Sequence, residues 1–156
     1  MKRTLWILPA IIAILLSFST LHQAEGHCQV PCGIYDDAAR VDAMQEHAVS
    51  IAKAMPEINA LLTQGTPVAF NQATRWVLEK DRSVTAIQEI VADYFLTQRV
   101  KSAAESSPDR KKYLEQLEAF HGILVAAMRC RSTTDPVVAQ SLEASIARIA
   151  PWYKNE

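Results

Sequence analysis

The chain has 156 residues, with 16 Lys or Arg against 17 Asp or Glu, which gives a formal net charge of −1. Because no basic patch or acidic run stands out, nucleic acid and anionic membrane surfaces are not expected as partners. Residues 27–156 are long enough for one domain with a modest core, and only four glycines leave little for irregular structure.

Residues 1–26 have the three parts of a secretory signal peptide. A basic start precedes an apolar run at residues 5–18, and small side chains at Ala24 and Gly26 predict that signal peptidase cuts before His27. The apolar run is short for a membrane span, which needs about 20 residues. We therefore expect an exported protein, periplasmic or extracellular, with no stable membrane span after cleavage.

The segment after the predicted cut, here called the hook (residues 27–35), carries a compact set of metal-binding groups: His27-Cys28-Gln29-Val30-Pro31-Cys32-Gly33-Ile34-Tyr35. Cleavage would give His27 a free α-amine. This amine, the Cys28 amide nitrogen and the sulfurs of Cys28 and Cys32 could then lie in one plane around a metal. Such a plane of two nitrogens and two sulfurs suits Ni(II) or Cu(II), whereas tetrahedral sulfur-rich sites suit zinc. The His27 imidazole is left as an axial ligand.

The cysteines and turn residues also allow purely structural interpretations. An exported protein can keep a Cys28–Cys32 disulfide, although a bridge between residues four apart at a chain end would constrain little chain. Cys130 lies in an apolar-rich segment and is expected to be a buried free thiol. Pro31 and Gly33 could form a turn that returns Cys32 toward Cys28, and the alternative is an ordinary surface turn.

The first helix predicted after the hook begins at an acidic pair. Asp36 and Asp37 are both N-cap candidates, and apolar positions recur at helical spacing over residues 38–55. Pro56 either stops or kinks this helix, because the apolar pattern resumes as far as Leu62.

Three further helices are predicted from start signals that contain proline. The second opens at Pro67 and ends near Val100, with a break of phase at residues 80–83 that is either a bend or a short loop. The third opens at Pro108 and the fourth at Pro136. No strand-like alternation or hairpin turn interrupts them.

The predicted fold class is therefore all-α. Residues 36–156 are expected to form an up-down-up-down four-helix bundle, behind the N-terminal metal hook at residues 27–35 and the cleavable signal peptide at residues 1–26. A bundle by itself does not indicate a function, so the functional prediction depends on the hook.

The hook resembles that of a known family. The pattern His-Cys-x-x-Pro-Cys-Gly-x-Tyr at a processed N-terminus, followed by four helices, is similar to nickel superoxide dismutase. The resemblance continues more loosely in residues 36–55, in Ala92-Asp93-Tyr94-Phe95 and in residues 146–153. One departure lies within the hook, because family members often carry Asp where this chain has Gln29.

The resemblance implies an enzyme that disproportionates superoxide to oxygen and hydrogen peroxide through a Ni(II)/Ni(III) cycle. It implies one nickel ion per subunit, held by His27, Cys28 and Cys32, and a homohexamer of four-helix bundles.

The resemblance also implies roles for residues around the metal. Tyr35 would be the catalytic residue that gates the approach of small anions, Asp42 would hold the axial imidazole, and Tyr94 would be a second tyrosine over the site. The alternatives are a packing aromatic for each tyrosine and a solvated helix face for Asp42. Arg75 and Arg82 are both candidates for the family arginine near the axial histidine.

Two other functions compete with this prediction. The same hook could serve a periplasmic metal-binding or metal-delivery module that holds copper or nickel without catalysis. Cu(II) outcompetes Ni(II) at many such sites, so metal affinity does not discriminate between the two functions. A thiol–disulfide protein is the third hypothesis, but the three residues between Cys28 and Cys32 depart from the common Cys-x-x-Cys redox spacing.

Overall fold

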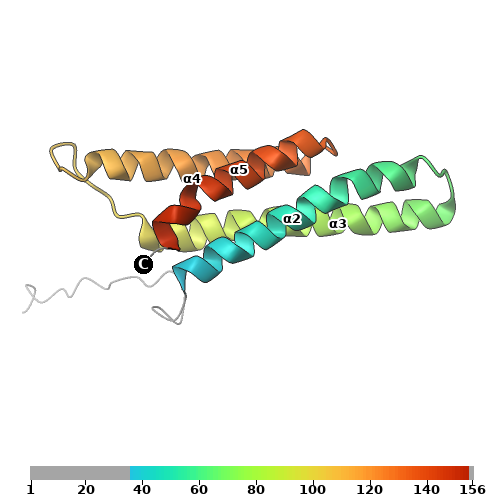
Figure 1. Cartoon of the computed structure of the whole chain (residues 1–156), viewed down its shortest axis with the longest axis horizontal. Coiled ribbons are helices and arrows are strands. Elements are labelled where there is room, and N and C mark those ends of the chain that lie inside the picture. Colours follow the sequence, from blue (N-terminus) through green and yellow to red (C-terminus); the bar gives the residue numbers. More distant parts are fainter. Residues whose placement is uncertain (1–35, 155–156) are drawn as a thin grey trace, which may run out of the picture.

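The computed structural model describes residues 36–154, so the signal peptide and the hook lie outside the described residues. Throughout this range the regular structure is helical and contains no strand. The elements in chain order are α2 (Asp37–Leu62), α3 (Pro67–Glu89), η2 (Ile90–Arg99), α4 (Arg110–Arg131) and α5 (Pro136–Tyr153). The π-helix η2 directly continues α3, so the two form one long rod (Figure 1).

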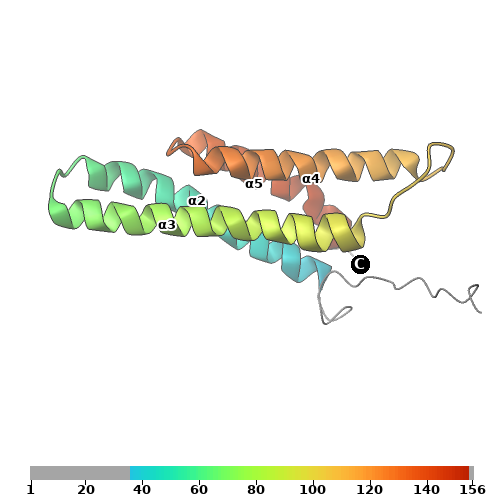
Figure 2. The ribbon, with the colours of Figure 1, turned by 180° about the vertical axis from the view of Figure 1, so that it is seen from behind.

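The helices are arranged around one core. α2 contacts α3 and α5, and α4 contacts the same two helices, which closes a ring of four. Figures 1 and 2 show successive helices running in opposite directions, so the predicted up-down-up-down bundle is confirmed. The start of α2, the end of η2 and the end of α5 lie near one end of the molecule, opposite the α2–α3 turn (Figure 1).

Local capping explains where α2 begins and ends. Asp36 is the N-cap, and its Oδ1 accepts hydrogen bonds from the backbone N–H of Ala38 at 2.8 Å and of Ala39 at 3.2 Å. Pro56 does not stop the helix, which continues to Leu62. The turn that follows contains Gly65 with a φ of 63°, a left-handed conformation that glycine adopts without steric cost.

Of the two alternatives for the break of phase at residues 80–83, the short loop is wrong, because α3 runs continuously from Pro67 to Glu89. Two polar residues interrupt the apolar pattern because they are buried and hydrogen-bonded. The Lys80 ammonium donates to the carbonyl oxygens of Cys130 at 2.7 Å and Arg131 at 2.8 Å, which are in the last turn of α4. Ser83 lies 3.3 Å from Nδ1 of His47 on α2.

The predicted start of the third helix was two residues early. α4 begins at Arg110, with Asp109 as its N-cap. The Asp109 side chain makes no capping hydrogen bond, whereas its backbone N–H donates to Ser107 Oγ at 3.2 Å. Ser107 and Pro108 therefore belong to the turn before the helix. The fourth helix begins as predicted, with Asp135 as N-cap and Pro136 in the first turn.

Aromatic rings fill the core at the end of the bundle where α2 begins. Phe95 of η2 stacks on Phe120 of α4 with ring centroids 4.9 Å apart, and it lies 4.9 Å from the ring of Tyr153 on α5. Burying a ring of this size stabilises the fold by about 1.5–3 kcal/mol. This cluster joins three elements and sets the position of η2 relative to the rest of the bundle.

The prediction for Cys130 can be compared with the structure, whereas the apolar run at residues 5–18 lies outside the described residues. Cys130 is a fully buried free cysteine, as expected, with its Sγ 3.6 Å from the Val138 carbonyl oxygen. Between residues 36 and 154, no helix combines the length and the apolar character that crossing a bilayer requires.

Candidate functional site

The end of the bundle where α2 begins is where the hook is attached, because Asp36 follows Tyr35 directly in the chain. The predicted metal ligands His27, Cys28 and Cys32 lie outside the described residues. The same holds for the other predicted hook residues, which are Pro31, Gly33 and Tyr35. The structure therefore bears on the site through the bundle residues that surround this attachment point.

A carboxylate at the first residue of α2 joins two side chains from η2. The Tyr94 hydroxyl donates a hydrogen bond to Asp37 Oδ1, and Arg99 Nε donates to Asp37 Oδ2 at 2.8 Å. The Asp37 side chain is only 11% exposed and Tyr94 is 5% exposed. We call these three residues the junction cluster, because they lie where the hook meets the bundle.

Electrostatics keep the Tyr94 phenol protonated. Burial raises the pKa of Tyr94 to about 12, and the hydrogen bond to Asp37 and the negative charge of that carboxylate act in the same direction. The positive charges of Arg99 and Arg40 oppose this shift. Tyr94 is therefore a hydrogen-bond donor to Asp37 across the physiological pH range.

The unusual helix η2 brings Tyr94 and Arg99 to the same carboxylate. In an α-helix, two residues five apart point in directions about 140° apart. The π-helix η2 instead has backbone bonds that span five residues, as where Val100 N–H donates to the Phe95 carbonyl at 2.8 Å. Residues five apart are then about one turn apart, and π-helical turns are often found at functional sites.

Asp42, predicted to hold the axial imidazole, is exposed on α2 and forms an ion pair with Lys154 after α5. Lys154 also donates to Gln45 Oε1 at 2.9 Å. Asp42 thus lies in the first turns of α2, with an ion-pair partner from the C-terminal end of the chain.

The two arginines considered for the site lie elsewhere on α3. Arg82 is paired with Glu79 at 2.7 Å, and its side chain is 73% exposed. Because His47 of α2 contacts Ser83, Arg82 lies about 15 Å along the bundle from the level of Asp37. Arg75 is also exposed, about two helical turns farther toward the α2–α3 turn.

Two arginines without a predicted role lie near the start of α2: Arg40 within that helix and Arg99 at the end of η2. Arg99 binds Asp37, and Arg40 lines a cleft of about 230 Å³ together with Tyr94, Asp93 and Glu89. No local signal in the sequence identifies Arg99, because it meets Asp37 only through packing of η2 against α2.

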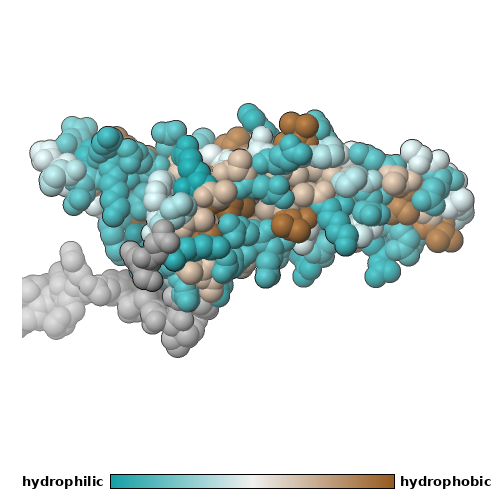
Figure 3. All heavy atoms as spheres, viewed as in Figure 1, coloured by the Kyte–Doolittle hydropathy of each residue, from teal (hydrophilic) through white to brown (hydrophobic). Residues whose placement is uncertain are grey.

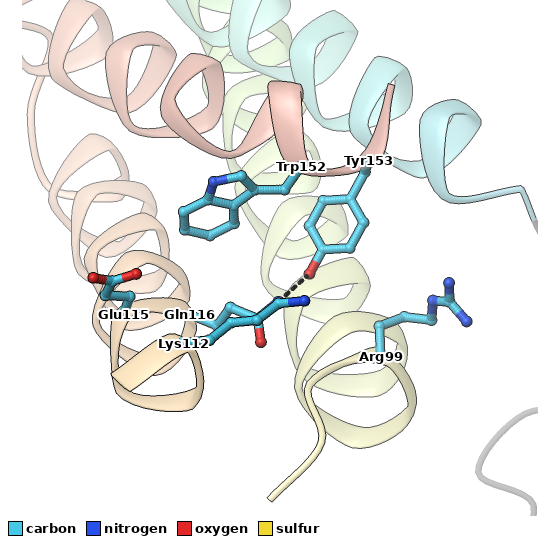
Figure 4. A pocket seen from close by; sticks show the side chains of 6 residues that line it. All are labelled: Arg99, Lys112, Glu115, Gln116, Trp152 and Tyr153. Atoms are coloured by element: carbon cyan, nitrogen blue, oxygen red, sulfur yellow. Dashed lines mark hydrogen bonds between the residues drawn. The ribbon is translucent and has the colours of Figure 1, made fainter. Parts of the chain in front are cut away.

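A second cleft opens at the same end of the bundle. It has a volume of about 280 Å³ and is lined by Arg99, Lys112, Glu115, Gln116, Trp152 and Tyr153 (Figure 4). Gln116 Nε2 lies 3.2 Å from the Tyr153 hydroxyl, across the gap between α4 and α5. Figure 4 shows the Arg99 guanidinium pointing away from Gln116 and Glu115, consistent with its bond to Asp37.

The side chains that could bind a metal are distributed unevenly along the chain. Residues 36–154 hold no group of three or more His, Cys, Asp or Glu side chains that could bind a metal ion. Burial raises the pKa of the Cys130 thiol and removes it from solvent, so it is a poor ligand. The remaining thiols, Cys28 and Cys32, are in the hook beside His27, and this sulfur and nitrogen set fits nickel.

A helical bundle whose first described helix directly follows a thiol- and imidazole-bearing segment in the chain, and whose start holds a buried tyrosine and a carboxylate, has the organisation of a small helical metalloenzyme. The family model for nickel-containing superoxide dismutase matches residues 22–156, a range that includes the hook and the whole bundle. The chain belongs to the nickel-containing superoxide dismutase family and is therefore an oxidoreductase that acts on superoxide. No curated protein and no solved structure matched the chain.

Proposed function

We propose that this protein is an exported superoxide dismutase whose hook binds one nickel ion per subunit through His27, Cys28 and Cys32. The observation that carries the proposal is the family match over residues 22–156, which includes all three ligands. The burial of Cys130 supports it as well, because the thiols that remain for a metal are those of the hook.

Nickel bound in this way would supply a one-electron Ni(II)/Ni(III) cycle, in which one superoxide is oxidised to oxygen and a second, with two protons, is reduced to hydrogen peroxide. Cys28 and Cys32 would hold the metal as thiolates, and the His27 imidazole would be a further ligand. Tyr35 gates the approach of small anions, while Pro31 and Gly33 shape the turn between the two cysteines.

Two bundle residues complete the proposed site. Tyr94 lies over the site as a second tyrosine, which its position in the junction cluster supports. Asp42 holds the His27 imidazole, which its location in the first turns of α2 supports. Its Oδ1 is the oxygen in contact with Lys154, and the second carboxylate oxygen can accept a hydrogen bond from an imidazole.

The proposal includes export and assembly. Cleavage by signal peptidase before His27 generates the α-amine ligand, and the mature protein acts in a periplasm or outside the cell. Six copies of the bundle form a homohexamer. Exposed apolar side chains on α3 support an interface, because Phe70 is 52% and Leu78 is 64% exposed. Figure 3 shows apolar surface among polar residues, including at the end of the molecule with the α2–α3 turn.

The test is to purify the form that begins at His27, load it separately with nickel and with copper, and follow superoxide decay by stopped-flow absorbance. We expect fast decay with nickel, at one nickel per chain by elemental analysis. A protein that binds nickel or copper tightly but leaves superoxide decay at the uncatalysed rate would instead be a metal-binding or metal-delivery module.

A further inference from the structure

The junction cluster contains an acid whose function helix capping does not explain. Asp36 already caps α2 through its side chain, whereas both Asp37 carboxylate oxygens are directed to residues of η2. Asp37 is 11% exposed on its side chain, although the first turn of a surface helix normally leaves a carboxylate in water. Removing a carboxylate from water is costly unless charge and hydrogen bonds compensate for it.

Two sources of positive potential lie beside the Asp37 carboxylate and compensate for this cost. Arg99 provides a full charge at 2.8 Å, and the amino end of α2 provides the partial positive charge of the helix dipole. An ionised carboxylate can only accept hydrogen bonds, so the Tyr94 hydroxyl must direct its proton toward Asp37. The lone pairs of the phenol oxygen then face away from Asp37 and can accept from another donor.

We propose that Asp37 is a positioning residue for Tyr94 in superoxide dismutation: together with Arg99, it holds the phenol at the base of the hook with its proton committed to the carboxylate. This inference rests on the proposed function. Fixed in this orientation, the Tyr94 oxygen accepts a hydrogen bond from a water molecule or a protonated group at the site. A phenol that could rotate would instead compete as a donor and disorder that water.

The experiment compares Asp37→Asn and Asp37→Ala with a matched control. Glu118→Gln also removes a carboxylate that faces an arginine, because Glu118 lies 4.0 Å from Arg148 at an exposed position away from the junction cluster. All proteins begin at His27, are loaded with nickel, and are assayed per bound nickel ion. We expect both Asp37 variants to lose about ten-fold or more in kcat/KM, because partners that orient residues around metal sites contribute that much. Glu118→Gln should match the wild type.

A second readout uses the nickel-free protein and does not depend on catalysis. Tyrosine ring carbons labelled with carbon-13 report ionisation by NMR, and a Tyr94→Phe protein identifies the Tyr94 signal. We expect the pKa of Tyr94, about 12 in the wild type, to fall in Asp37→Asn, because the negative charge is removed and the neutral amide oxygen is a weaker acceptor than the carboxylate. Burial is the largest cause and remains, so the pKa should stay above the ordinary value of about 10.

The outcomes separate this proposal from the proposed function. An inactive nickel-loaded wild type would overturn both. An active wild type with an equally active Asp37→Ala variant would overturn the positioning role alone, as would an unchanged pKa of Tyr94 in Asp37→Asn. Arg99→Lys should retain more activity than Arg99→Gln, because it keeps a charge beside Asp37. Circular dichroism of each nickel-free variant establishes that the helical content is unchanged.

Discussion

At the level of single residues, the three cysteines of the chain differ in where they occur along it. Cys130 is 0% exposed within the bundle core, and burial raises the pKa of its thiol, which disfavours the thiolate that a metal requires. Cys28 and Cys32 precede α2 in the chain. Their substitution should therefore affect the metal site without affecting the bundle.

We expect Cys28→Ser and Cys32→Ser each to remove nickel and activity while helical circular dichroism stays near that of the wild type. Elemental analysis and superoxide decay provide the measurement. Cys130→Ser is the matched control and should change neither metal content nor rate. Activity retained in either hook variant would contradict the ligand assignment.

The α-amine of His27 leads to a prediction about processing. A protein that keeps Gly26 converts this amine into a peptide nitrogen and displaces the free amine by one residue, so the donor set and its charge change. We expect activity only from the form that begins at His27, with each N-terminus verified by mass spectrometry before nickel loading. Equal activity from both forms would show that the amine is not a ligand.

At the level of the helices, a side chain from α3 binds the carbonyl groups at the end of α4. Lys80 is nearly buried, at 2% exposure, and its ammonium binds the carbonyl oxygens of Cys130 and Arg131. The carbonyl end of a helix is its negative end, so a cation there is favoured. Asp81, with Oδ1 3.3 Å from the ammonium, balances part of the charge. α3 and α4 are thereby joined by a polar contact, and Arg131 adds another by donating to Thr85 Oγ1 at 2.7 Å.

We expect Lys80→Met, which keeps the apolar stem and removes the ammonium, to lower the free energy of unfolding by about 2 kcal/mol, because two carbonyl groups lose a charged donor. Urea unfolding of the nickel-free protein, at one fixed protein concentration, measures the change in the free energy of unfolding. Lys111→Met is the control: its side chain is 88% exposed and makes a 3.8 Å ion pair with Glu115. Exposed pairs of this kind contribute about 0.5 kcal/mol. A Lys80→Met protein as stable as the control would show that the Lys80 ammonium does not stabilise the end of α4.

Whole molecule: a bundle of this size leaves part of its apolar surface exposed, and α3 carries a share of it. Phe70 and Val77 are seven residues apart, which places them on the same face of α3, and Leu78 is adjacent. Their exposed fractions are 52%, 38% and 64%, respectively. A contact between copies along this face would cover these side chains.

We expect the wild type to sediment as a hexamer and the double variant Phe70→Glu/Leu78→Glu to sediment as smaller species, because charges placed in an apolar contact are desolvated without partners. Gln72→Glu adds a charge to the other side of the same helix and should leave the assembly intact. A monomeric wild type would contradict the homohexamer, and a hexameric double variant would exclude this face as the interface. Analytical ultracentrifugation distinguishes these results.

The sequence alone determined the class of fold, and it predicts the chemistry of the hook. The starts at Asp36, Thr66 and Asp135 are readable because each capping bond forms within three residues along the chain. The predicted metal ligands of the hook likewise lie within six residues of one another in the chain, so the pattern is recognised without any tertiary contact.

Tertiary structure decided which distant residues surround the attachment point of the hook. Asp37 meets Tyr94 and Arg99 across 57 and 62 residues, and Lys80 meets the end of α4 across 50 and 51 residues. Such pairs depend on how the helices are packed and, for Arg99, on a change to π-helical geometry in η2. Sequence periodicity reports which face of a helix is apolar, but it does not report which polar side chain on that face finds a partner. The roles of Asp37, Arg99 and Lys80 therefore emerged only from the folded bundle, because each depends on a contact between separate helices.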